Sequence, residues 1–182
     1  MNKILRMIIV LTVIGLISGG ILAIVYNWSL PRIEENQIRE TDAAIFKVLP
    51  ETKSYQKVVK EDLTYFECFD KRGGRIGTAI LCEGTGYQGE IRLMLGINAD
   101  LSEFTGMAVL EQFETPGLGA KIAEKKFEEQ FRGLATRPPI EYVKAKAPEK
   151  PNEIQAITGA TISSRAVVNI INKTVKEWLE IQ

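Results

Sequence analysis

LTYFECF (63–69), IGTAILCE (76–83), EIRLMLGI (90–97) and FTGMAVLE (104–111) are the stretches of this chain that decide its fold. Each is a short run rich in apolar, β-branched and aromatic residues, and glycine-bearing turns such as RGG (72–74) and GTGYQG (84–89) separate them. Runs of this length between glycine turns are typical of consecutive antiparallel strands. We therefore predict an antiparallel sheet of about four strands between Tyr55 and Leu110.

Helical patterns follow this strand region. The stretch AEKKFEEQF (123–131) places Phe127 and Phe131 one turn apart on one helix face. From Ser164 to the end, apolar residues recur every three or four positions, at Val167, Val168, Ile171, Val175, Trp178 and Leu179. This stripe predicts a long amphipathic helix that packs on the sheet. The fold class is therefore α+β, with an antiparallel sheet flanked by helices.

The chain begins with an apolar segment. Met7 to Tyr26 contains no charged residue, and at about 1.5 Å per residue it is long enough to cross the roughly 30 Å hydrocarbon core of a bilayer. A cleaved signal peptide and a buried core helix are the alternatives, but the run is longer than a signal core and no clean Ala-x-Ala site follows it. Lys3 and Arg6 precede the segment, so the positive-inside rule keeps the amino terminus in the cytoplasm and exports the rest.

This interpretation divides the chain into four parts. Residues 1–6 are a cytoplasmic amino terminus, 7–26 a transmembrane helix, 27–50 a juxtamembrane linker and helix, and 51–182 an extracytoplasmic domain. The helix in the third part is expected to end at Leu49-Pro50, because a residue before proline is biased away from helical backbone. The expected location is the cell membrane, with a single span and the carboxyl-terminal domain outside the cytoplasm.

Composition excludes several classes of function. The 182 residues contain 23 basic and 23 acidic side chains, so there is no basic excess of the kind that binds nucleic acid. The chain has no histidine, which excludes histidine-ligated metals and histidine-dependent hydrolytic catalysis. Its two cysteines, Cys68 and Cys82, are too few for an iron–sulfur cluster, and whether they form a disulfide stays open. If the protein handles electrons, a bound organic cofactor must carry them.

The first motif with chemical meaning is TGAT (158–161), at the start of the last predicted helix. A helix amino terminus presents unpaired backbone N–H groups and positive dipole charge, which suit a phosphate. Gly159 and Ala160 leave space for a ligand, and the Thr161 hydroxyl is placed to bond to a phosphate or be esterified by it. An ordinary helix start is the alternative, with side chains suited to capping at Thr158, Thr161, Ser163 and Ser164.

The second motif is ETPGLG (114–119), a tight loop directly after a strand. A loop of this kind can lay its backbone polar groups against the edge of a planar heterocycle, while Leu118 and Thr115 supply apolar contact. The alternative is that the loop is only a turn, without a role in ligand binding. The GTGYQG turn (84–89), taken on its own, is interpreted as structural.

Taken together, these features resemble a known family. A single amino-terminal membrane helix, a GxGYxG turn, ETPGLG and a terminal TGATISSRAVV helix, in this order, are similar to the G subunits of the Rnf complex, an ion-pumping ferredoxin:NAD oxidoreductase. The resemblance covers almost the whole chain. It implies an FMN-binding domain and a role as an electron-relay subunit that is not catalytic alone.

The resemblance also implies the site. In this family FMN is attached as a phosphoester to the last threonine of the TGAT motif, here Thr161, by a flavin transferase. The family signature usually has Asp three residues before this motif, where this chain has Gln155. No catalytic acid or base and no metal ligand is expected. The candidate cofactor-binding residues are Thr158, Gly159, Ala160, Thr161, Ser163, Ser164, Glu114, Thr115, Pro116, Gly117, Leu118 and Gly119.

The implied partners are the other membrane and iron–sulfur subunits of the Rnf complex. Two alternatives stay open. The C subunit of the sodium-pumping NADH:quinone oxidoreductase shares the FMN-binding domain but is generally longer. A membrane-anchored binding or assembly domain without redox function would use TGAT only as a cap and ETPGLG only as a turn.

Overall fold

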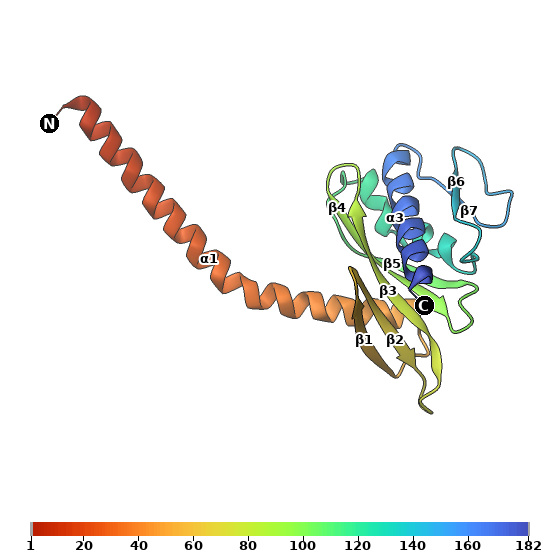
Figure 1. Cartoon of the computed structure of the whole chain (residues 1–182). Coiled ribbons are helices and arrows are strands. Elements are labelled where there is room, and N and C mark those ends of the chain that lie inside the picture. Colours follow the sequence, from red (N-terminus) through yellow and green to blue (C-terminus); the bar gives the residue numbers. More distant parts are fainter. Residues whose placement is uncertain (1, 182) are drawn as a thin grey trace. The chain divides into compact units, whose positions relative to one another are not determined.

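The computed structural model of the protein describes residues 2–181 (Figure 1). The chain forms two compact units, Met1–Glu40 and Thr41–Gln182. The elements, in order, are α1 (Lys3–Val48), β1 (Ser54–Lys60), β2 (Leu63–Phe69), β3 (Arg75–Thr85), β4 (Glu90–Asn98), β5 (Phe104–Gln112), the 3-10 turn η1 (Gly119–Ala123), α2 (Lys125–Glu128), the 3-10 turn η2 (Glu129–Phe131), β6 (Glu141–Val143), β7 (Glu153–Gln155) and α3 (Thr161–Glu180).

The first unit consists of the greater part of α1. Its apolar segment is long enough to cross a membrane, and the large apolar side chains there are exposed. The helix continues through Pro31 and ends at Val48, next to the predicted stop at Leu49-Pro50. These properties fit the predicted membrane anchor.

The second unit is built on one antiparallel sheet in the order β1-β2-β3-β4-β5. Strands β2 to β5 correspond to the four predicted runs, so the antiparallel α+β prediction is confirmed. The sheet has five strands rather than about four, because β1 was not among the predicted runs. That strand (SYQKVVK) has a mostly exposed pattern and lies at the sheet edge. A solvated, lysine-bearing edge strand lacks the apolar content that marks a strand in sequence.

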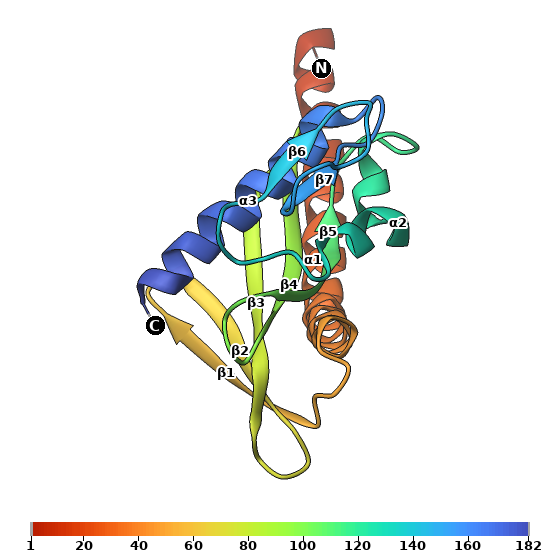
Figure 2. The ribbon, with the colours of Figure 1, turned by 90° about the vertical axis from the view of Figure 1, so that its right-hand side faces the viewer.

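Both faces of this sheet are covered. Helix α3 lies across one face (Figure 2), and its stripe Val167, Ile171, Val175 and Trp178 is buried there, as predicted. The other face packs against the end of α1, which contributes the buried residues Ala44, Ile45 and Val48. The sheet therefore has a core on each side.

Small residues let the end of α1 approach the sheet closely. A Cβ at Gly96 would lie 3.0 Å from the Val48 Cβ, and one at Gly77 would lie 3.0 Å from Cδ2 of Leu49, the residue that follows the helix. The Thr105 hydroxyl donates a 2.7 Å hydrogen bond to the Val48 carbonyl, which has no partner further along the helix. The carboxyl end of α1 is thus fixed to β5.

The predicted helix over 123–131 is present only in broken form. Helix α2 covers Lys125–Glu128, and 3-10 turns precede and follow it. The predicted pair of Phe127 and Phe131 is buried, with ring centroids 5.5 Å apart in an edge-on arrangement. The buried Glu128 carboxylate accepts from the Val109 N–H at 3.0 Å and pairs with Lys47 at 2.6 Å.

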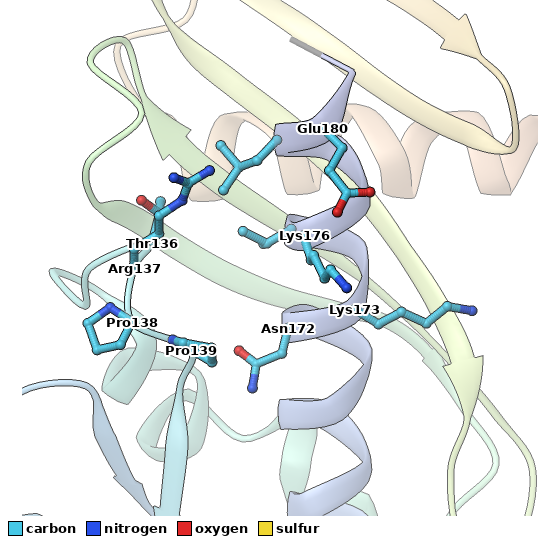
Figure 3. Close-up of a pocket in the computed structure, with 10 residues that line it drawn as sticks. Thr136, Arg137, Pro138, Pro139, Asn172, Lys173, Lys176 and Glu180 are labelled. Carbon is cyan, nitrogen blue, oxygen red and sulfur yellow. The ribbon is translucent and has the colours of Figure 1, made fainter.

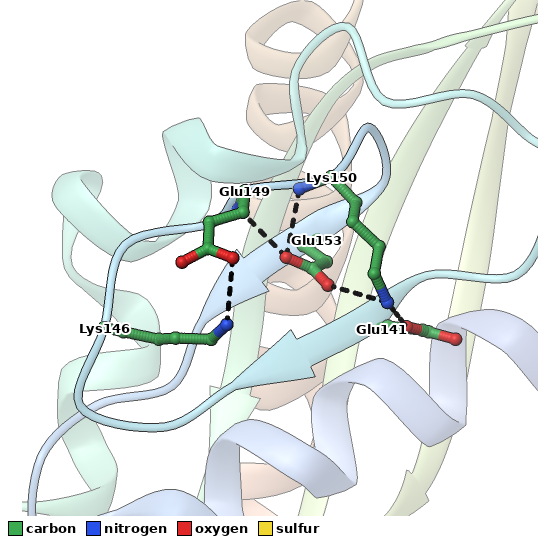
Figure 4. Close-up of polar contacts among 5 residues, drawn as sticks. All are labelled: Glu141, Lys146, Glu149, Lys150 and Glu153. Carbon is green, nitrogen blue, oxygen red and sulfur yellow. Dashed lines mark hydrogen bonds and ion pairs between the residues drawn. The ribbon is translucent and has the colours of Figure 1, made fainter.

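The proline-rich connection contains the short parallel strands β6 and β7, which the sequence did not indicate. A buried carboxylate, Glu153, organises the loop between them (Figure 4). It accepts from the backbone N–H groups of Glu149 (3.0 Å) and Lys150 (3.1 Å), and these bonds lower the pKa of Glu153. Lys150 also pairs with Glu153 and Glu141, and Lys146 pairs with Glu149.

The two cysteines are free thiols on opposite faces of the sheet. Cys68 is buried with Ala79 and Met94 on the α1 side, whereas Cys82 is buried with Leu93 on the α3 side. Burial raises the pKa of both thiols, that of Cys82 to about 12.

We expect two free thiols per untreated molecule, because side chains on opposite faces of a sheet cannot meet. Alkylation in denaturant without reductant should label both cysteines. Labelling of the folded protein at neutral pH should be slow, because a raised pKa leaves little thiolate. A molecule that gains thiols only after reduction would contradict this arrangement.

Candidate functional site

Three loops that are distant in sequence line one cavity of about 370 Å³. One is the turn after β3, the second is the ETPGLG loop after β5, and the third is the TGAT segment at the start of α3. The lining residues are Tyr87, Thr115, Leu118, Gly119, Gly159, Ala160, Thr161, Ile162 and Ser163. The structure therefore brings the TGAT and ETPGLG motifs together.

The amino end of α3 has no side-chain cap. Its N-cap residue is Ala160, no side chain bonds there, and the first turn holds no acidic residue. The first backbone N–H to find a helical acceptor is that of Ser164, which bonds to the Ala160 carbonyl at 3.0 Å. The preceding N–H groups, beginning at Thr161, are thus available to a ligand.

The capping interpretation of the hydroxyl side chains is wrong, because none of them bonds to the free N–H groups of the first turn. The Ser163 hydroxyl donates to Glu114 at 2.6 Å. The Ser164 hydroxyl donates to the Ala160 carbonyl and accepts from the Ile157 N–H, each at 3.0 Å, so it fixes the turn before the helix. Thr158 is exposed, and Thr161, the first residue of α3, is half-buried at the cavity.

Position 159 favours glycine for two reasons, its backbone conformation and the close approach of the neighbouring loop. Its φ is +81°, in the left-handed region that favours glycine. A Cβ there would also lie 3.3 Å from Leu118 Cδ2 of the ETPGLG loop. The turn before Thr161 therefore lies directly against the second motif.

Glu114 joins all three loops from behind the cavity wall. Its Oε1 atom accepts from the backbone N–H groups of Tyr87 (2.6 Å) and Gln88 (3.2 Å), and its Oε2 atom accepts from Ser163 Oγ (2.6 Å). The side chain is buried and does not line the cavity. The Glu114 side chain therefore fixes the three loops relative to one another and does not face the cavity.

The ETPGLG loop is a compact turn. The N–H groups of Leu118 and Ala120 both donate to the Thr115 carbonyl at 3.1 Å, and Gly117 has a φ of +75°. Leu118 is 47% exposed as a result, while Gly119 is buried beneath it.

Apolar side chains gather at the cavity in spite of their exposure. Tyr87 is 62% exposed, Ile162 is 48% exposed, and Leu118 lies with them. Exposed apolar groups around a hollow are typical of a ligand or partner site.

Not every candidate residue lines this cavity. Ser164 and Glu114 lie behind its wall, and Pro116 and Gly117 form the turn beside it. Thr158 lines a neighbouring cavity of about 300 Å³ that also includes Gln155 and Gln130.

Two lining residues, Tyr87 and Ile162, were not among the candidates that the sequence analysis named. The signal for Ile162 is an apolar residue off the buried stripe of α3, and the signal for Tyr87 is an aromatic in a glycine turn.

The residues present fit an esterified flavin phosphate. The uncapped N–H groups suit an anion, Thr161 supplies a hydroxyl beside them, and the glycine at 159 leaves the helix start open. A volume of about 370 Å³ lies at the lower end of the range for small-molecule sites, which is roughly 300 to 1,000 Å³. Within residues 2–181, no cluster of acidic or cysteine side chains could hold a metal ion.

A cavity of about 750 Å³ lies elsewhere, between residues 136–139 and the second half of α3 (Figure 3). Pro138, Pro139, Val175 and Leu179 give it apolar walls, and Asn172 is occupied by hydrogen bonds to Ile140. Residues of the TGAT and ETPGLG motifs do not line it. It is therefore separate from the candidate site.

Comparison with known proteins gives a consistent result. A model of the FMN-binding domain matches residues 86–176, which include all three cavity loops. The G subunit of the ion-translocating oxidoreductase complex of Methanosarcina acetivorans is 29% identical, and the match covers 96% of this chain and 94% of that protein. The G subunit of the Na(+)-translocating ferredoxin:NAD(+) oxidoreductase complex of Acetobacterium woodii is 30% identical, with coverages of 93% and 89%.

A solved structure shares the fold. The C subunit of the Na(+)-translocating NADH-quinone reductase from Parabacteroides distasonis superposes with a TM-score of 0.63 at 18% identity, over 82% of this chain and 95% of that one. At this identity the likeness concerns the fold alone.

Proposed function

Because the chain belongs to the FMN-binding domain family and to the G subunits of ion-translocating oxidoreductase complexes, we propose that it carries FMN as a phosphoester on Thr161 and relays electrons within such a complex. The observation that carries this proposal is the uncapped start of α3. It presents free N–H groups beside the Thr161 hydroxyl in the cavity that the ETPGLG loop also lines.

Each part of the site has a separate role in this proposal. The first N–H groups of α3 hold the phosphate, and Thr161 Oγ1 forms the ester bond. Leu118, Tyr87 and Ile162 contact the ring and exclude water from it, while Thr115 and the loop backbone supply polar contacts at its edge. When bound, FMN supplies one- and two-electron redox chemistry.

The protein acts as a redox subunit and is not catalytic alone. The chain has no histidine, and the residues that line the cavity include no carboxylate or amine for proton transfer to a substrate. A tethered cofactor cannot dissociate, which suits a domain outside the cytoplasm.

The membrane orientation is part of the proposal. The segment from Met7 to Tyr26 is proposed to span the bilayer once, with Lys3 and Arg6 on the cytoplasmic side. The flavin domain would then lie outside the cytoplasm, where a flavin transferase modifies it. Its partners would be the membrane and iron–sulfur subunits of the complex.

Intact mass of the full chain, coexpressed with a flavin transferase, tests this function. We expect an increase equal to one FMN less one water, and the modified peptide should contain Thr161. An unmodified, colourless protein under conditions that modify a known acceptor would favour the assembly-domain alternative. Copurification with quinone-linked subunits would favour the quinone-reductase alternative.

Gln155→Asp is expected to raise the flavinylated fraction when transferase is limiting, because the family signature has Asp at this position. The fold should tolerate the change. The Gln155 side chain is exposed, and its backbone N–H and carbonyl bond to the Gln130 side chain at 2.7 and 3.3 Å. Intact mass during a time course measures the fraction. An equal rate for both proteins would show that glutamine serves as well as aspartate.

A further inference from the structure

The Glu114 carboxylate differs from the other buried carboxylates of the described chain. Three glutamate side chains are buried, Glu114, Glu128 and Glu153. Glu128 pairs with Lys47 at 2.6 Å and Glu153 pairs with Lys150 at 3.4 Å. Among the ion pairs of residues 2–181, none includes Glu114. Its negative charge is therefore held by neutral donors alone.

Those donors are the Tyr87 N–H, the Gln88 N–H and the Ser163 hydroxyl. The two backbone groups can only donate, so one carboxylate oxygen accepts from both, and the second lies within hydrogen-bond distance of Ser163 Oγ. A glutamine could keep the two backbone contacts through its amide oxygen, and its amide nitrogen could donate to Ser163 Oγ in the reverse direction, without a charge. Burying a charge without a counter-ion costs more than burying an amide, so joining the loops does not by itself explain a carboxylate here.

The charge lies directly behind the cavity wall. Its Oε2 atom is 2.6 Å from Ser163 Oγ, and Ser163 lines the cavity. A Cβ at Gly119, another lining residue, would lie 2.7 Å from the same oxygen. One lining residue therefore separates this charge from a ligand in the cavity, and because the carboxylate is buried its screening is weaker than in water.

We propose that Glu114 is a positioning residue that joins the three loops and whose fixed negative charge lowers the reduction potential of FMN held in this cavity. The inference rests on the proposed function. The physical reason is that electron uptake makes the ring more negative, and a nearby negative charge that is screened less than in water opposes that change.

Glu114→Gln is the test, because it removes the charge and keeps the hydrogen bonds. The amide oxygen accepts from Tyr87 and Gln88, and the amide nitrogen donates to Ser163, whose hydroxyl turns to accept. We expect the flavinylated full-length variant to have a more positive midpoint potential than the parent protein in a spectroscopic redox titration. The matched control is Glu128→Gln, a buried carboxylate away from the cavity, which should leave the potential unchanged.

The positioning part is tested without flavin, in a Thr161→Ala background. Glu114→Ala removes the side-chain acceptor of the Tyr87 and Gln88 N–H groups, whereas Glu114→Gln keeps an acceptor for both. The alanine variant should therefore have the lower thermal midpoint. Equal midpoints would overturn the joining role.

The remaining outcomes are also decisive. A flavinylated Glu114→Gln protein with an unchanged or more negative potential would overturn the electrostatic role, and so would an equal upward shift in Glu128→Gln. A Glu114→Gln protein that stays unmodified would also overturn it, because the charge would then serve attachment. Absence of flavin from the parent protein instead contradicts the proposed function.

Discussion

Thr161→Ala is expected to abolish the covalent flavin completely while the fold stays intact. The side chain is half-buried at the first position of α3 and is proposed as the ester oxygen, so its removal leaves no acceptor. Its effect on stability should be within about 0.5 kcal/mol, because it belongs to neither core. Intact mass of the variant coexpressed with the transferase measures the loss.

Thr158→Ala is the matched control for this prediction. Thr158 carries the same hydroxyl in the same motif, but it is exposed in the neighbouring cavity, so the variant should keep its flavin. A persistent adduct on Thr161→Ala would contradict the assignment and leave Thr158, Ser163 and Ser164 as acceptors. Of these, Ser163 bonds to Glu114 and Ser164 bonds to the turn before the helix, so Thr158 would be tested next.

Sequence reasoning succeeded where burial makes a periodic pattern. The strands β2 to β5 and helix α3 bury one or both faces, and their apolar residues recur accordingly. It failed where burial is slight or contacts are distant. Strand β1 is mostly exposed, and strands β6 and β7 are three residues each and pair across a loop held by Glu153.

The helix predicted over 123–131 fails for a related reason. The spacing of Phe127 and Phe131 suits a helix, and both side chains are buried. Their place against the sheet is reached by a single helical turn between two 3-10 turns, which spacing alone does not distinguish from a longer helix.

The candidate site shows the same division. Residues of TGAT and ETPGLG were assigned to one cofactor because each motif has a composition suited to one part of a ligand, and both motifs line one cavity. The partners of the hydroxyl groups were not predicted. Ser163 is suited to capping its own helix, yet it bonds to Glu114, which is distant in sequence and close only after the sheet has formed. Tertiary competition of this kind leaves no local pattern.

Gly119→Val is expected to change the surroundings of the flavin ring strongly without removing the ester. A Cβ at this position would lie 2.7 Å from Glu114 Oε2 and 2.8 Å from Ser163 Oγ, so the side chain forces these two groups apart. Overpacking of this kind costs about 1–3 kcal/mol. The absorbance, fluorescence and potential of the flavin should shift, while intact mass still includes it, because Thr161 lies on α3 and not on this loop.

Gly117 provides the contrast within the same loop. A Cβ there meets no atom within 4 Å, and the only requirement is a φ of +75°. Gly117→Asn should therefore be tolerated, because asparagine adopts this conformation more readily than other side chains. Gly117→Val should lose about 1–2 kcal/mol from backbone strain alone. Flavin spectrum and thermal midpoint measured on the same samples separate crowding at the cofactor site from backbone strain in the loop.

A folded, flavinylated Gly119→Val protein with the parent spectrum and potential would remove the ETPGLG loop from the cofactor site, since the crowding of Glu114 and Ser163 would then have no effect on the ring.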